Sequence, residues 1–286
     1  MGSHPSGLHA RYTVNSFSVP YRPSVDRRAM SSSFDSPVPD PSRLDHIETR
    51  WSLLRRSSGA VSGDVAMARQ TLVLRYASAI RGYCRAILGS DADADEMSQD
   101  VVVRLLQGDF AGADPQRGRF RDLLRTAIRN MARNRWSREN RRTGASALDD
   151  DRFADPEAEA VDDPWLPQWR ATLLENTWEE LRRYQESQPN SCFHTVLRSR
   201  TDFPEATSEQ LAAKVSEQLG REVNAASVRQ NLRRSRVKYC ELLVEEVADG
   251  LDHPTRDRVQ EELIALDLWS SVKDMLPDDW RPQARP

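Results

Sequence analysis

The chain has 286 residues, of which 30% are charged and 38% hydrophobic, and its formal net charge at pH 7 is −3. This length allows two ordinary domains, and the composition suits helix-rich small domains better than one large core. No apolar run approaches the roughly 18 residues of a membrane span, and the N-terminus lacks the apolar core of a signal peptide.

Cysteine and histidine usage points away from disulfide and metal chemistry. The three cysteines lie far apart and the five histidines are dispersed, so we expect a reducing cytoplasm, no metal and no cofactor. Asp91, Asp93 and Asp95 alternate, but they lack the glycine and the distal glutamate of a calcium loop. Common enzyme signatures are absent from the sequence, and we expect a protein that is not an enzyme.

Residues 1–43 are rich in Ser, Pro and Arg and show no sustained periodicity, which predicts a disordered leader. Met30 offers an alternative start of translation within it. Order is expected from about residue 44. A long amphipathic helix follows, with apolar residues at steps of three and four from Val65 to Ile87, and Gly89 is expected to end it.

The next predicted helix begins at Ser90 or Asp91 and ends before Gly108. Acids in its first turn are explained by the helix dipole alone. Gln99 and Asp100 lie beyond that turn, so this face either is simply solvated or binds a partner. The residues of the face are Asp95, Glu96, Gln99 and Asp100.

The segment 117–142 concentrates positive charge in a slightly acidic chain. Ten arginines there face only Asp122 and Glu139, which gives a local charge of +8. Apolar residues recur at helical steps from Phe120 to Met131, so one helix face is expected to pack while the others are basic. This pattern predicts contact with nucleic acid, against the alternatives of a solvated helix or an interaction arm.

After this helix the charge inverts. Between Asp149 and Asp163 eight acids stand against Arg152, a local charge of −7, and prolines interrupt the segment. We interpret residues 143–167 as a flexible acidic linker between two domains.

The second predicted domain covers residues 168–250. Thr207 or Ser208 is expected to cap one helix, Gly220 to end it and Asn224 to cap the next, which describes a helix-turn-helix. An αα-hairpin that does not bind DNA is the alternative. Residues 251–286 form an extension with one further helix from Val259 to Leu276, either docked on the second domain or available to a partner.

Three motifs in this order resemble a bacterial sigma factor of the sigma-70 family. Residues from Glu96 to Asp100 are similar to the D/E-x-x-Q-E/D motif that binds core polymerase. The run from Phe120 to Arg138 resembles FRxxLxxxARNxxRNxxR, and the run from Ala226 to Arg236 is similar to GTVKxRLxRAR. The resemblance covers residues 45–250 and is nearest to the short extracytoplasmic function (ECF) subfamily.

The resemblance implies an all-α fold of two small helical domains joined by the acidic linker. Residues 44–142 would be the region-two-like domain, which binds core RNA polymerase and recognises and melts the minus-ten element. Residues 168–250 would be the region-four-like domain, whose helix-turn-helix reads the minus-thirty-five element. The chain would thus direct promoter-specific initiation. A stand-alone helix-turn-helix transcriptional regulator is the alternative.

The resemblance also implies partners and site residues. Asp95, Glu96, Gln99 and Asp100 would bind the β′ clamp helices of core RNA polymerase, whose β flap is a further expected contact, and an anti-sigma or other regulatory partner would contact the leader or the tail. Promoter DNA is the other partner. Phe120 is interpreted as core more than as a stacking platform, and Phe110 as the freer aromatic. The minus-ten set is Phe110, Arg117, Arg119, Phe120, Arg121, Arg125, Asn130, Arg133 and Asn134. The minus-thirty-five set is Ser227, Arg229, Gln230, Asn231, Arg233, Arg234, Arg236 and Lys238.

Overall fold

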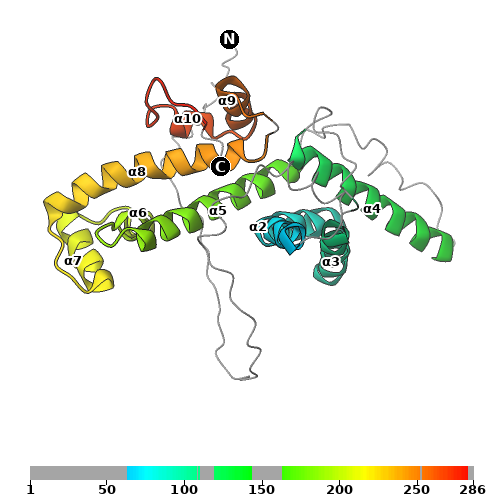
Figure 1. The fold of residues 1–286 in the computed structure, drawn as a ribbon. Helices are drawn as coiled ribbons and strands as arrows, with labels where there is room; N and C mark the ends of the chain where they lie inside the picture. The colour runs from blue at the N-terminus through cyan, green and yellow to red at the C-terminus, as the bar shows by residue number, and fades with distance from the viewer. Residues whose placement is uncertain (1–62, 108, 110–118, 144–162, 252, 283–286) are drawn as a thin grey trace, which may run out of the picture. The chain divides into compact units, whose positions relative to one another are not determined.

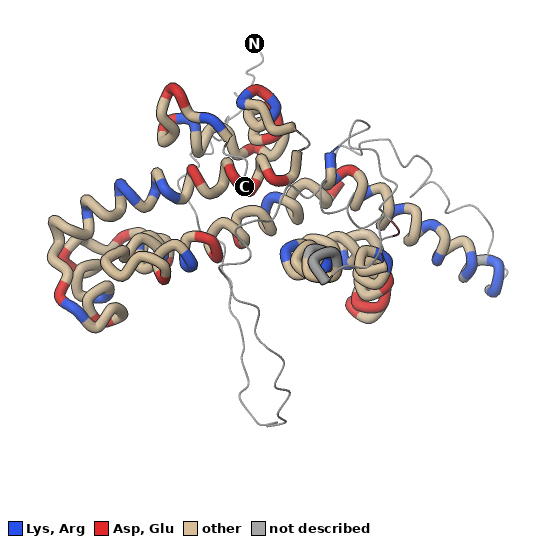
Figure 2. Tube along the Cα trace, in the orientation of Figure 1, with Lys and Arg blue, Asp and Glu red and all other residues tan. Residues whose placement is uncertain are grey.

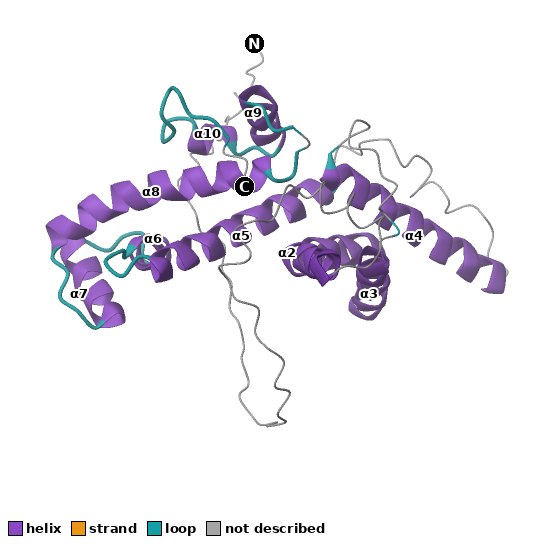
Figure 3. Cartoon of the chain, in the orientation of Figure 1, coloured by secondary structure: helices purple, strands orange, loops and turns teal. Residues whose placement is uncertain are grey.

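Figure 1 shows the computed structural model, which describes residues 63–107, 109, 119–143, 163–251 and 253–282. Every regular element within these residues is a helix, as the colouring of Figure 3 makes clear. The all-α fold class is therefore confirmed for the described part of the chain. None of the described helices has both the length and the hydrophobicity that a membrane crossing requires.

Helices α2 and α3 form the first packed pair. α2 spans Gly63–Leu88 and α3 spans Asp91–Gln107. Gly89 between them has φ of 71°, a left-handed conformation that glycine adopts readily and that commonly ends a helix. Ser90 Oγ accepts a hydrogen bond from the backbone N–H of Asp93 at 3.4 Å. The predicted end of α2 and the predicted start of α3 are thus confirmed.

Helix α4, Phe120–Thr143, contains most of the basic segment and packs against α2 and α3. Its buried apolar residues follow one helical stripe, and each is at most 1% exposed. Ala127 and Met131, which the sequence pattern placed on the stripe, are only half-buried. The buried stripe consists of Phe120, Leu124, Ile128 and Ala132.

Helix α5, Trp165–Ser187, packs on α2 through aromatic side chains. The ring of Trp169 stacks on that of Tyr76 with centroids 4.8 Å apart, and the rings of Trp165 and Tyr83 are 5.0 Å apart. All four rings are buried, and such pairs add about 0.5–1.5 kcal/mol each beyond the area they bury. The sequence placed α5 in a domain with the helix-turn-helix, whereas its aromatic residues join the core of α2.

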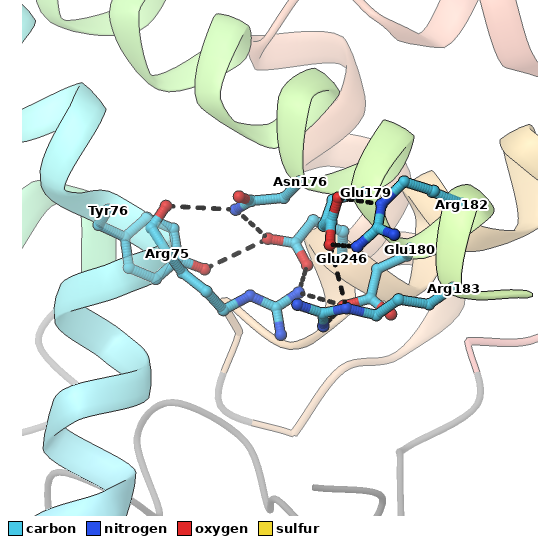
Figure 4. A network of polar contacts seen from close by, with 8 residues as sticks. All are labelled: Arg75, Tyr76, Asn176, Glu179, Glu180, Arg182, Arg183 and Glu246. Carbon is cyan, nitrogen blue, oxygen red and sulfur yellow. Dashed lines mark hydrogen bonds and ion pairs between the residues drawn. The ribbon is translucent and has the colours of Figure 1, made fainter. Parts of the chain in front are cut away.

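A buried carboxylate links α2, α5 and the end of α8, which spans Ala225–Ala248. Glu246 is fully buried and accepts hydrogen bonds from Arg75, from Tyr76 Oη at 3.3 Å and from Asn176 Nδ2 at 3.0 Å. Figure 4 shows this network and its continuation into exposed ion pairs of α5. Because the carboxylate is satisfied on all sides, its charge is tolerated in the core.

The C-terminal extension forms two short helices, α9 at Arg256–Ala265 and α10 at Trp269–Val272. The prediction of one helix from Val259 to Leu276 is therefore wrong. Asp267 adopts φ of 55°, which interrupts the helix, and the apolar side chains of Leu266 and Leu268 are buried on either side of it. Burial of both leucines offsets the backbone penalty of the left-handed residue.

Helices α6, Phe193–Asp202, and α7, Ser208–Leu219, pack together. Thr207 caps α7 in a reciprocal capping box with Gln210. Gly220 ends α7 with φ of 62°, and Asn224 Oδ1 accepts from the backbone N–H of Ser227 at 2.8 Å at the start of α8. The predicted caps at Thr207 and Asn224 and the predicted end of α7 at Gly220 are confirmed.

The chain divides into two compact units, and the boundary falls inside α8. Residues 192–235 belong to one unit. Residues 63–191 and 236–282, where described, belong to the other, which contains the helices α2 to α5, α9 and α10. The domain boundaries expected from the sequence differ from this division and stay a prediction. The leader and most of the acidic linker lie outside the described residues.

Candidate nucleic-acid interface

Basic residues recur along α4 and are frequent near its C-terminal end (Figure 2). Arg138, Arg141 and Arg142 near the C-terminal end of the helix are exposed. Nearer the start, the arginines are more deeply placed, and Arg121 is only 7% exposed. The arginines at the C-terminal end of α4 therefore face solvent, whereas those near its start are more buried.

A groove of about 280 Å³ opens between α3 and α4. Leu123, Ala127 and Met131 give it an apolar lining, and two asparagines stand beside them. Arg133 Nη2 donates to Asn130 Oδ1 at 3.1 Å, which orients that amide. Asn134 is exposed. The complete lining is Arg104, Leu123, Thr126, Ala127, Asn130, Met131 and Asn134.

Two arginines at the start of α4 share one carboxylate. Arg121 Nε lies 2.6 Å from Glu262 Oε1, and Arg119 Nη1 lies 2.7 Å from Glu262 Oε2. The side chains of Arg121 and Glu262 are 8% and 5% exposed. This is a nearly dry ion pair between α4 and α9.

The next two arginines share a second carboxylate, that of Asp163. Arg125 Nη2 lies 2.6 Å and Arg129 Nη1 3.4 Å from Asp163 Oδ2, and the side chain of Asp163 is 9% exposed. Its other oxygen accepts from the backbone N–H of Trp165 at 2.9 Å. Nearby, burial first and then the negative charge of Asp163 raise the pKa of Tyr83 to about 12.

The acidic face of α3 is also tied to basic partners. Asp95 pairs with Arg81 of α2 at 2.5 Å, and Arg135 of α4 lies 2.8 Å from Glu96 and 2.7 Å from Asp93. The hydrogen bond from Arg135 to Glu96 is the main cause that raises the pKa of this arginine. These pairs are partly exposed, so each contributes little to stability. Gln99 and Asp100 are exposed on the same helix.

The predicted minus-thirty-five residues follow α8 from its first turn. Asn231 Nδ2 donates to the backbone oxygen of Ser227 at 2.9 Å, and Lys238 pairs with Glu241 at 3.2 Å. These three predicted contact residues are half-buried. The exposed members of the set are Arg229, Gln230, Arg233, Arg234 and Arg236.

The sequence patterns did not identify Asp163 and Glu262 as site residues. A signal was present for Glu262, because it shares an otherwise apolar helix face with Val259, Leu263 and Leu266, all buried. An acid on such a stripe is expected to have a buried basic partner.

Of the predicted contacts, Phe110 and Arg117 lie outside the described residues. Among the residues that are described, no cluster of His, Cys, Asp or Glu could hold a metal ion.

Residues 72–142 match the family model described as Sigma-70 region 2. The segment is similar to a sigma-70 region 2, and we call residues 72–142 region 2 below. This match supports a sigma factor of the sigma-70 family with a role in transcription initiation. A search of curated proteins and a search of solved structures each gave no match.

Region 2 here begins within α2 and ends within α4. It therefore includes the acidic face of α3, the groove and all the arginines of α4 described above. Asp163 and Glu262, which pair with four of these arginines, lie outside the matched segment. Region 2 is thus held by acids from parts of the chain that the family model does not cover.

Proposed function

We propose that the chain is an ECF-type sigma factor that binds core RNA polymerase and directs promoter-specific initiation. It acts by binding and without catalysis, in the cytoplasm. Region 2 recognises the minus-ten element and aids strand opening, and the α7–α8 helix-turn-helix recognises the minus-thirty-five element.

The observation that carries this proposal is the groove between α3 and α4 inside region 2. Strand opening requires a site that holds an unstacked base, which needs an apolar surface and a directed polar edge. Leu123 and Met131 supply the apolar surface. The amides of Asn130 and Asn134 supply the polar edge, with a donor and an acceptor for a base. Arg104 at the same groove is suited to a phosphate.

Core binding is assigned to the α3 face with Asp95, Glu96, Gln99 and Asp100. Its exposed acids suit a basic surface such as that expected of the β′ clamp helices. Arg81 and Arg135 hold Asp95 and Glu96 from the neighbouring helices, so the face is presented in one geometry. Such preorganisation lowers the entropy lost on docking.

Recognition of the minus-thirty-five element is assigned to α8. Arginine reads guanine edges and glutamine reads adenine in the major groove, and Arg229 and Gln230 near its start are exposed. Further along the helix, Arg233 and Arg234 are exposed and suit phosphates. Asn231 bonds to its own helix and is a weaker candidate for base contact.

Promoter-dependent transcription with purified core polymerase, with and without the full chain, tests the function. We expect specific transcripts only when the chain is present. A stand-alone regulator would instead bind a promoter duplex tightly by itself and add nothing to core enzyme, and that result would reject the sigma assignment.

A further inference from the structure

Four arginines, one just before α4 and three in its first half, pair with two carboxylates that are distant in the sequence. Arg119 and Arg121 share Glu262, and Arg125 and Arg129 share Asp163. All four belong to region 2, and three of them are in the predicted minus-ten set. Their acidic partners come from α9 in the C-terminal extension and from the residues just before α5.

These contacts differ from ordinary surface ion pairs because they exclude water. The side chains of Arg125, Arg129 and Asp163 are 12%, 11% and 9% exposed, which is close to the burial of the Arg121–Glu262 pair. A buried ion pair adds little net stability, yet removal of one partner leaves a costly unpaired charge. The arginines and their carboxylates therefore stay in contact while both are charged. When one charge is removed, the remaining buried charge makes the closed arrangement unfavourable.

A carboxylate that accepts bonds from two guanidinium groups resembles a backbone phosphate in being an anion whose oxygens accept from arginine. Arg119, which is 35% exposed in its side chain, shows that this cluster opens toward solvent on one side. A nucleic-acid strand that contacts these arginines must displace the carboxylates from them. The two acids thus compete directly with phosphate for the same donors.

We propose that Glu262 of the C-terminal extension, together with Asp163, is an internal phosphate mimic that holds region 2 in a closed state with low affinity for DNA. This inference rests on the assignment of α4 as a DNA-binding helix. Release of α9 from the start of α4 exposes Arg119 and Arg121 and raises DNA affinity. The extension is accordingly an autoinhibitory element of this chain.

The test compares Glu262→Gln with Glu261→Gln in the full chain. Glu261 is on the same helix and exposed, so its substitution removes the same formal charge without touching an arginine. Affinity for a short fluorescent single-stranded DNA is measured by anisotropy over a range of salt concentrations. We expect Glu262→Gln to bind about tenfold or more tightly than wild type at low salt, and Glu261→Gln to stay within about twofold.

The salt dependence gives a second readout that a general charge effect would not produce. Each phosphate contact on a single strand contributes about 0.7 to the slope of log affinity against log salt. Two released arginines should therefore steepen the slope of Glu262→Gln by about 1.4. Equal slopes and affinities for the two variants would overturn the proposal.

Asp163→Asn provides an independent variant, because it removes the negative charge that Arg125 and Arg129 share. We expect the same direction of change in affinity and slope. Helicity by circular dichroism is recorded for each variant. If both variants lose their helical signal, the carboxylates are structural and the proposal is rejected.

The outcome separates this proposal from that of the sigma function. If the chain initiates with core polymerase but its Glu262→Gln variant binds DNA no better than wild type, the autoinhibitory proposal fails and the sigma function stands. If the chain fails to initiate but its Glu262→Gln variant binds DNA more tightly and with a steeper salt slope, the autoinhibitory proposal stands and the sigma assignment fails.

Discussion

Glu246 contributes to the core of its unit as a charged residue. It is fully buried at the end of α8 and contacts Arg75 and Tyr76 of α2 and Asn176 of α5 (Figure 4). Burial by itself acts to lower the pKa of Arg75, but the combined attraction of Glu246 and of Tyr76, Glu180 and Asp249 outweighs it, so the pKa of this arginine is raised. Arg75 therefore stays charged, and its contact with Glu246 joins α2 to the end of α8.

Replacement of Glu246 by Gln should destabilise the fold by about 3 kcal/mol or more, because Arg75 is then left without its main counter-charge in a buried site. Urea denaturation followed by circular dichroism measures the change. Glu186→Gln is the matched control, since Glu186 forms an exposed pair with Arg182 and its loss should cost no more than ~0.5 kcal/mol. Equal denaturation midpoints for the two variants would contradict this account.

The Cys84 thiol should be unreactive in the folded chain. Burial raises its pKa to about 12, whereas an unfolded thiol titrates near ~8.5. Between these values the unfolded state releases a proton that the folded state keeps. The free energy of unfolding therefore falls by about 1.4 kcal/mol for each pH unit between pH ~8.5 and pH ~12, and this contribution of Cys84 is fully present only below pH ~8.5.

Labelling with a chromogenic disulfide reagent at mildly alkaline pH measures this protection. We expect Cys84 to react in urea and not in the native protein, with mass spectrometry to assign the site. Cys240, whose pKa burial also raises to about 12, should behave alike and serves as an internal comparison. Rapid labelling of Cys84 under native conditions would show that α2 opens locally.

At the scale of elements, α3 and α4 make the site together. The groove between them takes Arg104 from α3 and its asparagines from α4, and Arg135 ties the two helices through Asp93 and Glu96. Asn130 and Asn134 are four residues apart, so one helix face presents both amides. The arrangement suits one base held between an apolar wall and an amide edge.

Substitution of Asn130 or Asn134 by Ala should reduce promoter opening about tenfold, because a good amide–base contact contributes roughly 1–3 kcal/mol. Permanganate reactivity of unpaired thymines in the polymerase–promoter complex measures opening. Gln107→Ala removes an exposed amide at the end of α3, outside the groove lining, and should leave opening unchanged. If all three variants open DNA equally, the groove is not the base site.

At the scale of the whole molecule, region 2 is part of a larger unit. α5, the end of α8 and α9 all contribute contacts to it, and these contacts join residues up to 171 positions apart in the sequence. The acidic face of α3 stays exposed in this unit at Glu96, Gln99 and Asp100. If core polymerase docks on this face as proposed, docking can begin while Arg119 and Arg121 are still paired with Glu262.

The triple variant with Ala at Glu96, Gln99 and Asp100 should bind core polymerase at least about tenfold more weakly, a loss of ~1.4 kcal/mol. Fluorescence anisotropy of labelled chain with purified core enzyme measures the affinity. Its helical stability should change little, since the one ion pair that it removes is exposed. Unchanged core affinity would remove the assignment of this face.

A second triple variant separates a local effect from a change in net charge. Asp257, Glu261 and Asp274 are exposed acids of the C-terminal extension. Their replacement by Ala should leave the affinity for core polymerase within about twofold of wild type. An equal loss in both triple variants would mean that overall charge, rather than the α3 face, sets the affinity.

The sequence alone determined the features that depend on neighbouring residues. Helix ends at Gly89 and Gly220 and caps at Thr207 and Asn224 were predicted correctly, because backbone conformation and capping are settled within a few residues. The motifs of the α3 face and of α4 likewise pointed to the family whose region 2 model matches them. The charge and the spacing of residues in a motif can be recognised without knowledge of the tertiary structure.

Only the tertiary structure decided what those charges contact. Arg121 and Glu262 are 141 residues apart, and no local pattern links an arginine to one acid among 44 acidic residues in the chain. The same holds for the packing of α5 on α2 and for the break at Asp267, which depends on burial of the leucines beside it. Such pairings follow from burial, which brings distant segments together and makes an unpaired charge unfavourable.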